Sequence, residues 1–283
     1  MLRLILSPSV GGTAGYLYDA VAALASSDGE AVLIVPEQYS FAAERIVLER
    51  LGTADAQRVE VLSFTRLANT VFNSVGWDKG KRLNEAGKIL LMSRALEQCA
   101  DKLTVYARSA DSPAVVRELL VLSEEFCQCA ISYEDIVSAM NNMEEGLLKD
   151  KLGDISLVFS VYDSFVSDGW LDDSRMLTRL KDKLAESGYF KNKTVFFDSF
   201  RGFTAQEFGI IGKILTQADD VCVALNAPDL TDVGSDDIFY HTKNTAKKLI
   251  KIANSVDVPC AKPVTVNEPN SNASPDALGQ DLL

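Results

Sequence analysis

The chain has 283 residues, enough for one large domain or two medium ones. Its 28 lysines and arginines against 40 aspartates and glutamates give a formal net charge of −12, so contact with a polyanion has to be local. A single histidine, His241, disfavours Ser-His-Asp catalysis, Cys-His catalysis and most zinc sites.

The cysteines are odd in number and include no CxxC pair, so we expect reduced thiols. The first residues run directly into a turn instead of a secretory signal. No stretch approaches the ~18 consecutive apolar residues of a membrane span. We therefore expect a cytoplasmic protein that does not enter a membrane. The cysteines are Cys99, Cys127, Cys129, Cys222 and Cys260.

Strands and helices alternate through the first 75 residues. Each short apolar run is closed by a turn signal and followed by apolar residues at helical spacing. The second helix is expected to end at Gly52. The predicted strands are 2–6, 31–35 and 59–64, and the predicted helices are 16–25, 40–51 and 65–75.

From residue 84 to about residue 187 the apolar spacing is helical and no strand pattern occurs. Strands then return at 194–197 and 220–225, with a helix at 204–216 between them. This alternation predicts a mostly parallel sheet with right-handed crossovers. We expect an α/β domain of residues 1–80 and 188–266, an inserted all-helical subdomain of residues 81–187, and a linker or tail of residues 267–283.

The loop after the first strand is a candidate phosphate site, because backbone N–H groups at a helix N-terminus bind anions. Against the P-loop pattern GxxxxGK[ST] it keeps Gly12, next to Gly11. Thr13 stands where the lysine belongs, and Ala14 stands where the hydroxyl that binds Mg²⁺ belongs. An ordinary Gly-rich strand–helix turn is the alternative reading.

Asp198 ends an apolar strand, as does the aspartate that holds Mg²⁺ in P-loop NTPases. Ser199 follows it where a helicase-type ATPase would carry a glutamate that prepares the attacking water. A turn or helix-cap residue is the simpler interpretation of Asp198. The two degenerate motifs in this order and separation weigh more than either alone.

The chain lacks the [DE]-x-K triplet of a metal-dependent nuclease, so we expect no catalytic residues and no metal site in it. Cys127 and Cys129 lie on an apolar helical stretch, where core packing is the expected role. Lys243, Lys247 and Lys251 share one helical face, which is usually a solvated one.

Two strand ends combine aromatic and hydrogen-bonding residues, as proteins that hold single-stranded nucleic acid do. The first is the segment from Pro36 to Phe41, and the second runs from Ser63 to Arg66. Loop capping with half-buried aromatic rings is the alternative.

These segments together resemble the N-terminal part of the AddB and RexB family, helicase-like subunits of bacterial ATP-dependent helicase/deoxyribonucleases that process double-strand breaks for recombination. The resemblance spans roughly residues 1–230, and such proteins continue into a second helicase-like half and a nuclease domain with an iron–sulfur cluster. We therefore expect an N-terminal fragment. The matching segments are the Gly-rich loop, VPEQYSFAAER (35–45), VLSFTRLA (61–68), KLGDI (151–155) with Tyr162, LDD (171–173) and FDSFRGFTAQE (197–207).

The resemblance implies a RecA-like fold, that of P-loop NTPases and superfamily 1 helicases. It makes Gly11, Gly12 and Thr13 a degenerate nucleotide-binding loop and Asp198 a degenerate second motif. It also implies DNA contacts through Gln38, Tyr39, Ser40, Ser63, Phe64 and Arg66.

The resemblance further implies DNA and an AddA-like helicase/nuclease subunit as partners, and scanning of DNA for a recombination hotspot. Without the lysine and the glutamate we expect no resident ATP with Mg²⁺. The iron–sulfur cluster of the family belongs to its nuclease domain, so we expect none in this chain. We expect a DNA-binding domain without ATPase or nuclease activity. An active nucleotide-dependent enzyme whose loop binds phosphate through backbone N–H groups is one alternative. A structural module that docks a basic protein is the other.

Overall fold

The computed structural model describes residues 1–77, 80–232 and 234–266, and its contacts divide these into two compact units. The sheet unit contains residues 1–63, 190–202 and those described from 214 onward, and the helical unit contains 64–189 and 203–213. Residues 64–77 and 203–213 group with the helices by their contacts. The expected domain limits at residues 80 and 188 stay a prediction, because contact density does not define a folding domain. The expected tail, residues 267–283, lies outside the described residues.

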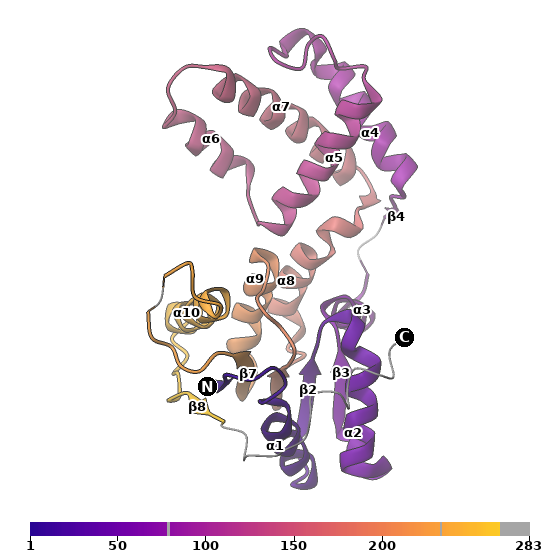
Figure 1. The fold of residues 1–283 in the computed structure, drawn as a ribbon. Helices are drawn as coiled ribbons and strands as arrows, with labels where there is room; N and C mark the ends of the chain where they lie inside the picture. Colours follow the sequence, from indigo (N-terminus) through magenta and orange to yellow (C-terminus); the bar gives the residue numbers. More distant parts are fainter. Residues whose placement is uncertain (78–79, 233, 267–283) are drawn as a thin grey trace, which may run out of the picture. The chain divides into compact units, whose positions relative to one another are not determined.

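The sheet unit is built on a parallel sheet, which confirms the predicted α/β fold with RecA-like character (Figure 1). In the described part of the chain six strands are paired in the order β3-β2-β6-β7-β1-β8. The later strands β6 and β7 separate β1 from β2. The strands are β1 (Leu2–Ser7), β2 (Glu30–Ile34), β3 (Val59–Leu62), β6 (Lys193–Phe197), β7 (Asp220–Asn226) and β8 (Val264–Thr265).

Helices cover both faces of this sheet, which explains why its strands are nearly continuous apolar runs. Along β2, Ala31 and Leu33 belong to the core under α1 (Ala14–Ser26) and α2 (Ser40–Asp55). Residues between them point to the opposite face because strand side chains alternate. On the sheet, α10 (Tyr240–Ser255) packs against β1 and β7.

The first part of α2 ends where predicted, since Gly52 leaves the helical conformation with φ 69°, and a short helical segment beyond this kink carries α2 on to Asp55. Glycine populates this left-handed region without the clash that a Cβ causes. The predicted third strand is two residues too long, because β3 ends at Leu62 and Phe64 already begins α3. Short 3-10 segments are η1 (Glu37–Tyr39), η2 (Ala56–Arg58), η3 (Ala100–Lys102) and η4 (Asp173–Arg175).

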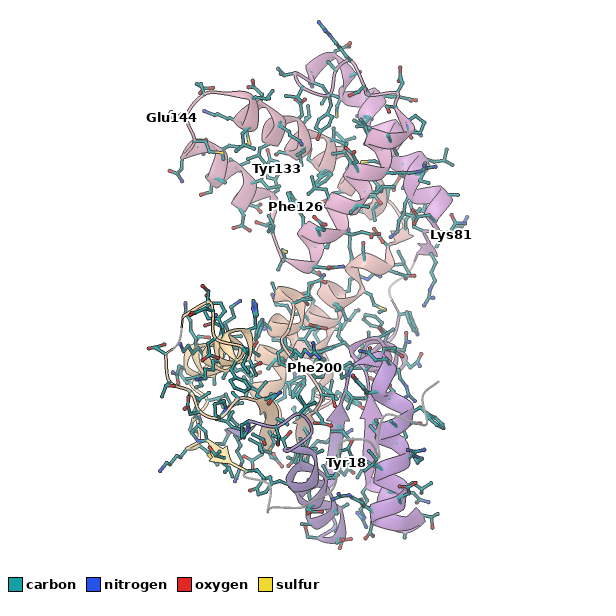
Figure 2. All side chains as sticks on the ribbon, in the orientation of Figure 1. Tyr18, Lys81, Phe126, Tyr133, Glu144 and Phe200 are labelled. Atoms are coloured by element: carbon teal, nitrogen blue, oxygen red, sulfur yellow. The ribbon has the colours of Figure 1, made fainter. Side chains whose placement is uncertain are left out.

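The helical unit packs around one apolar core, in which Phe126, labelled in Figure 2, meets Phe159 edge-on with ring centroids 5.6 Å apart. It departs from an all-helical subdomain at one place. There β4 (Lys81–Arg82) pairs in parallel with β5 (Trp170–Leu171). The helices are α3 (Phe64–Val75), α4 (Glu85–Cys99), α5 (Pro113–Gln128), α6 (Tyr133–Asn141), α7 (Leu147–Ser167), α8 (Met176–Ser187) and α9 (Ala205–Leu215), whose last two residues belong to the sheet unit.

All five cysteines are free of disulfides. The prediction of core packing is wrong for Cys129, which is exposed at the end of α5. Cys127 is only partly buried. No helix in the described ranges is both long enough and apolar enough to cross a membrane.

An ion triad, in which Lys88 and Asp172 are buried and Glu124 is partly exposed, gives the acidic motif 171–173 a structural role. The Lys88 ammonium lies 3.0 Å from the Asp172 carboxylate and 2.8 Å from Glu124. Despite burial, these contacts lower the pKa of the Asp172 carboxyl and raise the pKa of Lys88. Asp172 therefore ties β5 and η4 to α4 and α5, a structural role that its position in the motif did not reveal.

A second buried carboxylate organises the chain between η3 and α5. Asp154 of α7 is 4% exposed and accepts hydrogen bonds from the backbone N–H groups of Thr104, Val105 and Tyr106 at 2.7 to 3.1 Å. Without it, three amide donors in a partly buried segment would lose their acceptor.

Replacing Asp154 by asparagine is expected to lower the free energy of unfolding by roughly 2 kcal/mol, because charge-assisted acceptance is lost and an amide donor faces backbone donors. Urea unfolding followed by circular dichroism measures the change. The matched control is Asp150→Asn, an exposed carboxylate in the first turn of the same helix, which should cost less than about 1 kcal/mol. Equal losses in the two variants would contradict the structural role of Asp154.

Candidate nucleotide and nucleic-acid site

The carboxyl ends of β1, β2, β6 and β7 surround a pocket of 510 Å³ within the sheet unit. From β1 the chain proceeds through α1 to β2, past β7 and β6. From β7 it proceeds through α10 in the opposite direction, past β1 to β8. In parallel α/β sheets, ligands bind outside the carboxyl ends where connections diverge in this way. The pocket is therefore the leading candidate site.

The Gly-rich loop after β1 forms one wall of this pocket, with Gly11 and Thr13 among its lining residues. Gly11 has φ +78°, a conformation that glycine adopts without strain. A Cβ on Gly12 would lie 2.2 Å from Ser7 Oγ and 2.3 Å from Ser9 Oγ, so any other residue would force both hydroxyls to move. The predicted special role of these glycines thus has a local structural reason, the tight packing of two serine hydroxyls inside the loop.

The loop closes on itself through its own hydrogen bonds. Gly12 N–H donates to the Ser9 carbonyl at 3.1 Å, and Ala14 N–H donates to the Gly11 carbonyl at 3.0 Å. Ser9 N–H donates to Ser7 Oγ at 3.4 Å. In a phosphate-binding loop such N–H groups face the anion instead. Together with Thr13 and Ala14 in place of the lysine and the hydroxyl, this loop does not fit a nucleoside triphosphate with Mg²⁺.

Asn226 fixes the start of the loop. It ends β7 opposite Ser7 in the strand register. With its side-chain amide oriented to suit its neighbours, it donates to the carbonyls of Ser7 at 2.8 Å and Pro8 at 3.2 Å. Sequence reasoning missed Asn226, although a polar residue directly after a buried strand was a visible signal.

Asp198 lies at the end of β6 in the pocket wall and is 7% exposed. Burial raises the pKa of its carboxyl, and hydrogen bonds from Ser199 oppose this rise. Ser199 has φ 64°, a left-handed conformation that is rare for serine. Where the structure describes the chain, it shows no group of three or more His, Cys, Asp or Glu side chains that could hold a metal ion.

The remaining wall combines aromatic rings with one cation. Phe200, labelled in Figure 2, lines the pocket with Tyr39 and Phe239. Arg201 is the only basic residue among the described residues that line it. The sequence placed Arg201 inside the matching segment 197–207 without giving it a contact, and it did not indicate Phe239, whose segment has no strong pattern.

Two ion pairs fasten the segment that carries Phe239. Lys243 is buried and lies 2.8 Å from the Asp229 carboxylate, whose pKa it lowers. Lys247 binds Asp232. The expectation of a solvated lysine face is therefore wrong for Lys243, because its ammonium is used inside the sheet unit.

The first predicted DNA-contact segment follows β2 at the same edge. Gln38 and Tyr39 are exposed in η1, and Tyr39 lines the pocket. Ser40 is buried, and its hydroxyl has no hydrogen-bond partner among the described residues. The structure thus brings Tyr39 together with Asp198, Gly11 and Thr13.

The second predicted segment is divided between the two units. Ser63 is buried in the sheet unit and donates a hydrogen bond to the Glu37 carboxylate. Phe64 belongs to the helical unit, where its buried ring meets Phe203 edge-on at 6.4 Å between centroids, so its face is not open to a base. Arg66 is exposed on α3.

Comparison with known proteins identifies relatives along nearly the whole chain. Residues 4–279 match the family described as ADDB, N-terminal. The chain is 34% identical over 248 residues to the B subunit of the ATP-dependent helicase/deoxyribonuclease of Ruminiclostridium cellulolyticum, covering 86% of this chain and 22% of that protein.

Other relatives carry the same name. The protein of Clostridium novyi is 32% identical over 246 residues, which is 87% of this chain and 22% of the relative. That of Thermoanaerobacter sp. is 31% identical over 238 residues, which is 84% of this chain and 21% of the relative. The chain thus spans little more than a fifth of the length of these relatives.

The burial of Asp198 predicts a pH-dependent stabilisation by Asp198→Asn. Well below pH 4 the carboxyl is neutral in the folded and the unfolded chain, and at pH 4 it is only partly ionised in the unfolded chain, so the substitution should change little there. As pH rises, the wild type has to bury a charged carboxylate in order to fold. The stabilisation by Asp198→Asn therefore grows until the pH passes the raised folded-state pKa, and then levels off. We expect a melting temperature higher by roughly 2 to 4 °C at pH 8.

Thermal unfolding at pH 4 and pH 8 measures this difference between the variant and the wild type. Asp182→Asn, an exposed carboxylate on α8, is the control and should be neutral at both pH values. A variant that melts below the wild type at pH 8 would show that the Asp198 charge is stabilised in the fold.

Proposed function

The chain belongs to the AddB N-terminal family, and on that premise we propose that it is the helicase-like, DNA-binding part of an AddB-like component of an ATP-dependent helicase/deoxyribonuclease. In this proposal it takes part in processing DNA double-strand breaks for recombinational repair in the cytoplasm. It binds DNA and an AddA-like helicase/nuclease subunit, but it neither hydrolyses ATP nor cuts DNA.

The loop after β1 is the strongest support for the proposal that this chain does not hydrolyse ATP. It occupies the position of a nucleotide-binding loop at the carboxyl edge of a parallel sheet, yet Thr13 lines the pocket where a lysine would be needed. The N–H groups of Gly12 and Ala14 are already bound inside the loop. A triphosphate would lose a charge-assisted contact and two amide donors, and no resident cofactor is part of the proposal.

The exposed residues at the same edge support a role in holding DNA. Gln38 offers an amide for phosphate or base hydrogen bonds, and Tyr39, 47% exposed, offers a ring face for stacking. Ser63 contributes indirectly, since its hydroxyl binds Glu37 at the start of η1. Such contacts are local, as the net charge of −12 requires.

The curated relatives are named as subunits of an enzyme with helicase and deoxyribonuclease activity. For this chain we propose that the corresponding motor and nuclease chemistry belongs to other parts of such an assembly. The absence of a [DE]-x-K triplet from the sequence is in keeping with this division.

The purified protein is expected to release no phosphate from ATP, with or without single-stranded DNA. A phosphate-release assay with added Mg²⁺ measures this, and the Asp198→Asn protein sets the background. DNA-dependent turnover above that background would contradict the proposal. Tight ATP binding in calorimetry that Gly12→Val abolishes would favour the alternative of a backbone-only phosphate site.

Single-stranded DNA binding is expected, with an affinity that falls steeply as salt rises. Tyr39→Ala should weaken binding roughly 10-fold, because one stacked base contributes about 1 to 3 kcal/mol. Fluorescence anisotropy of a labelled oligothymidylate measures both effects. Leu48→Ala removes a side chain of similar exposure, 50% against 47%, from the body of α2 and should leave binding unchanged.

Absence of salt-sensitive binding by the wild type would favour the other alternative, a module that docks a basic protein. Equal losses of DNA affinity in the Tyr39 and Leu48 variants would show that the carboxyl edge of the sheet is not the DNA-contact site.

A further inference from the structure

The pocket at the carboxyl edge of the sheet contains polar side chains that the fold itself does not use. Thr13 and Thr242 line it from the Gly-rich loop and from α10, and they are only 8% and 9% exposed. Thr13 is the N-cap residue of α1, yet its hydroxyl makes no capping hydrogen bond. Neither hydroxyl bonds to any other described residue. Because buried hydroxyls normally have partners, this pair favours a ligand in the pocket.

Arg201 supplies the positive charge of the pocket wall. It is exposed, and it makes no hydrogen bond, ion pair or ring contact with any described residue. Asp198 is the acid in the described lining, but it makes no ion pair with Arg201, and burial raises the pKa of its carboxyl. The guanidinium can therefore bind an anion, to which it presents two parallel N–H donors.

Two aromatic side chains of the lining have no ring partner. Tyr39 is 47% exposed and Phe239 is partly buried, and neither meets another aromatic ring in the described part of the chain. Phe200 differs, since its ring lies 6.2 Å from that of Phe197, centroid to centroid. Tyr39 and Phe239 can thus receive a planar ligand, on which an aromatic ring stacks.

These groups match a nucleoside that carries a single phosphate. Its base is planar, its edges and sugar offer partners for hydroxyl and carboxyl groups, and its phosphate is anionic. A longer phosphate chain would need the loop N–H groups, but those of Gly12 and Ala14 donate inside the loop. The described lining also has no second cation for further phosphates. The arrangement therefore favours one phosphate over three.

We propose that this pocket binds one nucleoside monophosphate unit, with its base against Tyr39 and Phe239 and its phosphate on Arg201. The hydroxyls of Thr13 and Thr242 bind the base or the sugar. A free mononucleotide and one nucleotide of a single DNA strand share this chemistry. The inference rests on the proposed function in one respect, namely that the Gly-rich loop does not hold a triphosphate.

A series of thymidine compounds tests how many phosphates the pocket holds. In ligand-observed NMR titrations of the purified protein, we expect a Kd for dTMP below about 1 mM. Binding of dTMP should be roughly 10-fold tighter than that of thymidine, because Arg201 makes a charge-assisted contact with the phosphate. Two further phosphates, in dTTP with Mg²⁺, should improve the affinity less than about 3-fold, since they meet no additional donor.

The contribution of Arg201 is measured by the difference between dTMP and thymidine. Arg201→Ala should remove the preference for dTMP and leave the affinity for thymidine unchanged. The matched control is Lys191→Ala, which removes an exposed cation of the sheet unit outside the described pocket lining. Because Lys191 precedes β6 and Arg201 follows it, the control should keep the full preference. Circular dichroism shows whether both variants fold.

Removal of an aromatic ring provides a second readout. Phe239→Leu should weaken dTMP binding roughly 10-fold, because one stacked base contributes about 1 to 3 kcal/mol. Phe41→Leu removes a ring that is 78% exposed on α2 and lies outside the described lining, so it should leave dTMP binding unchanged. If Phe239→Leu does not fold, the comparison of Arg201 with Lys191 decides.

Competition between dTMP and oligothymidylate identifies the source of the nucleotide. Displacement of dTMP by oligothymidylate, together with weaker DNA binding by Arg201→Ala, would support the inference with a nucleotide of the strand as the ligand. DNA binding that leaves dTMP in place would support it with a free mononucleotide as the ligand.

A preference for dTMP over thymidine that Arg201→Ala removes and Lys191→Ala keeps would support the inference. Absence of dTMP binding at about 5 mM, or a preference that survives in Arg201→Ala, would overturn it. In either case the proposed function would stand if the wild type still bound DNA. Binding of dTTP more than about 10-fold tighter than that of dTMP would overturn the inference and also the proposal that the loop holds no triphosphate.

Discussion

The pairing of β1 with β7 is the interaction on which the candidate site depends. This parallel ladder places Ser7 opposite Asn226, whose amide then holds the first carbonyls of the Gly-rich loop. Because β6 pairs with β7 on its other side, Asp198 reaches the same edge. Residues more than 200 positions apart in the chain, such as Gly11 and Asn226, thus share one pocket because of main-chain hydrogen bonds.

Local patterns predicted the sheet well, since its strands are buried on both faces and their apolar runs are short and sharply bounded. Gly52 ended its helix where expected. Partnerships between distant residues were not predictable. Two examples are the ion pair between Lys243 and Asp229 and the hydrogen bonds from three backbone N–H groups to Asp154. Both depend on how distant segments pack, which residue spacing in the sequence does not reveal. The short β4–β5 pair also escaped prediction because two-residue strands have no periodicity.

The cavities of the two units differ more clearly in the charged residues that line them than in shape. In the sheet unit, the pocket has one buried carboxyl and one arginine among its described lining residues, and its aromatic rings form much of the wall. In the helical unit, the described lining of a second cavity includes Arg175, which pairs with Asp163, and Arg179, which donates to the Asp172 carbonyl. A strongly acidic protein can meet a polyanion only through such restricted surfaces, and this limits contact to strands that reach them.

The packing inside the Gly-rich loop bears on how this chain could change over evolutionary time. The hydroxyls of Ser7 and Ser9 lie where a Cβ on Gly12 would be, and the turn is already closed by its own hydrogen bonds, so a lysine introduced at position 13 would not by itself turn the loop N–H groups toward a phosphate. Phosphate binding by this loop would therefore require substitutions at several positions together, and a lysine at position 13 alone is not expected to provide it.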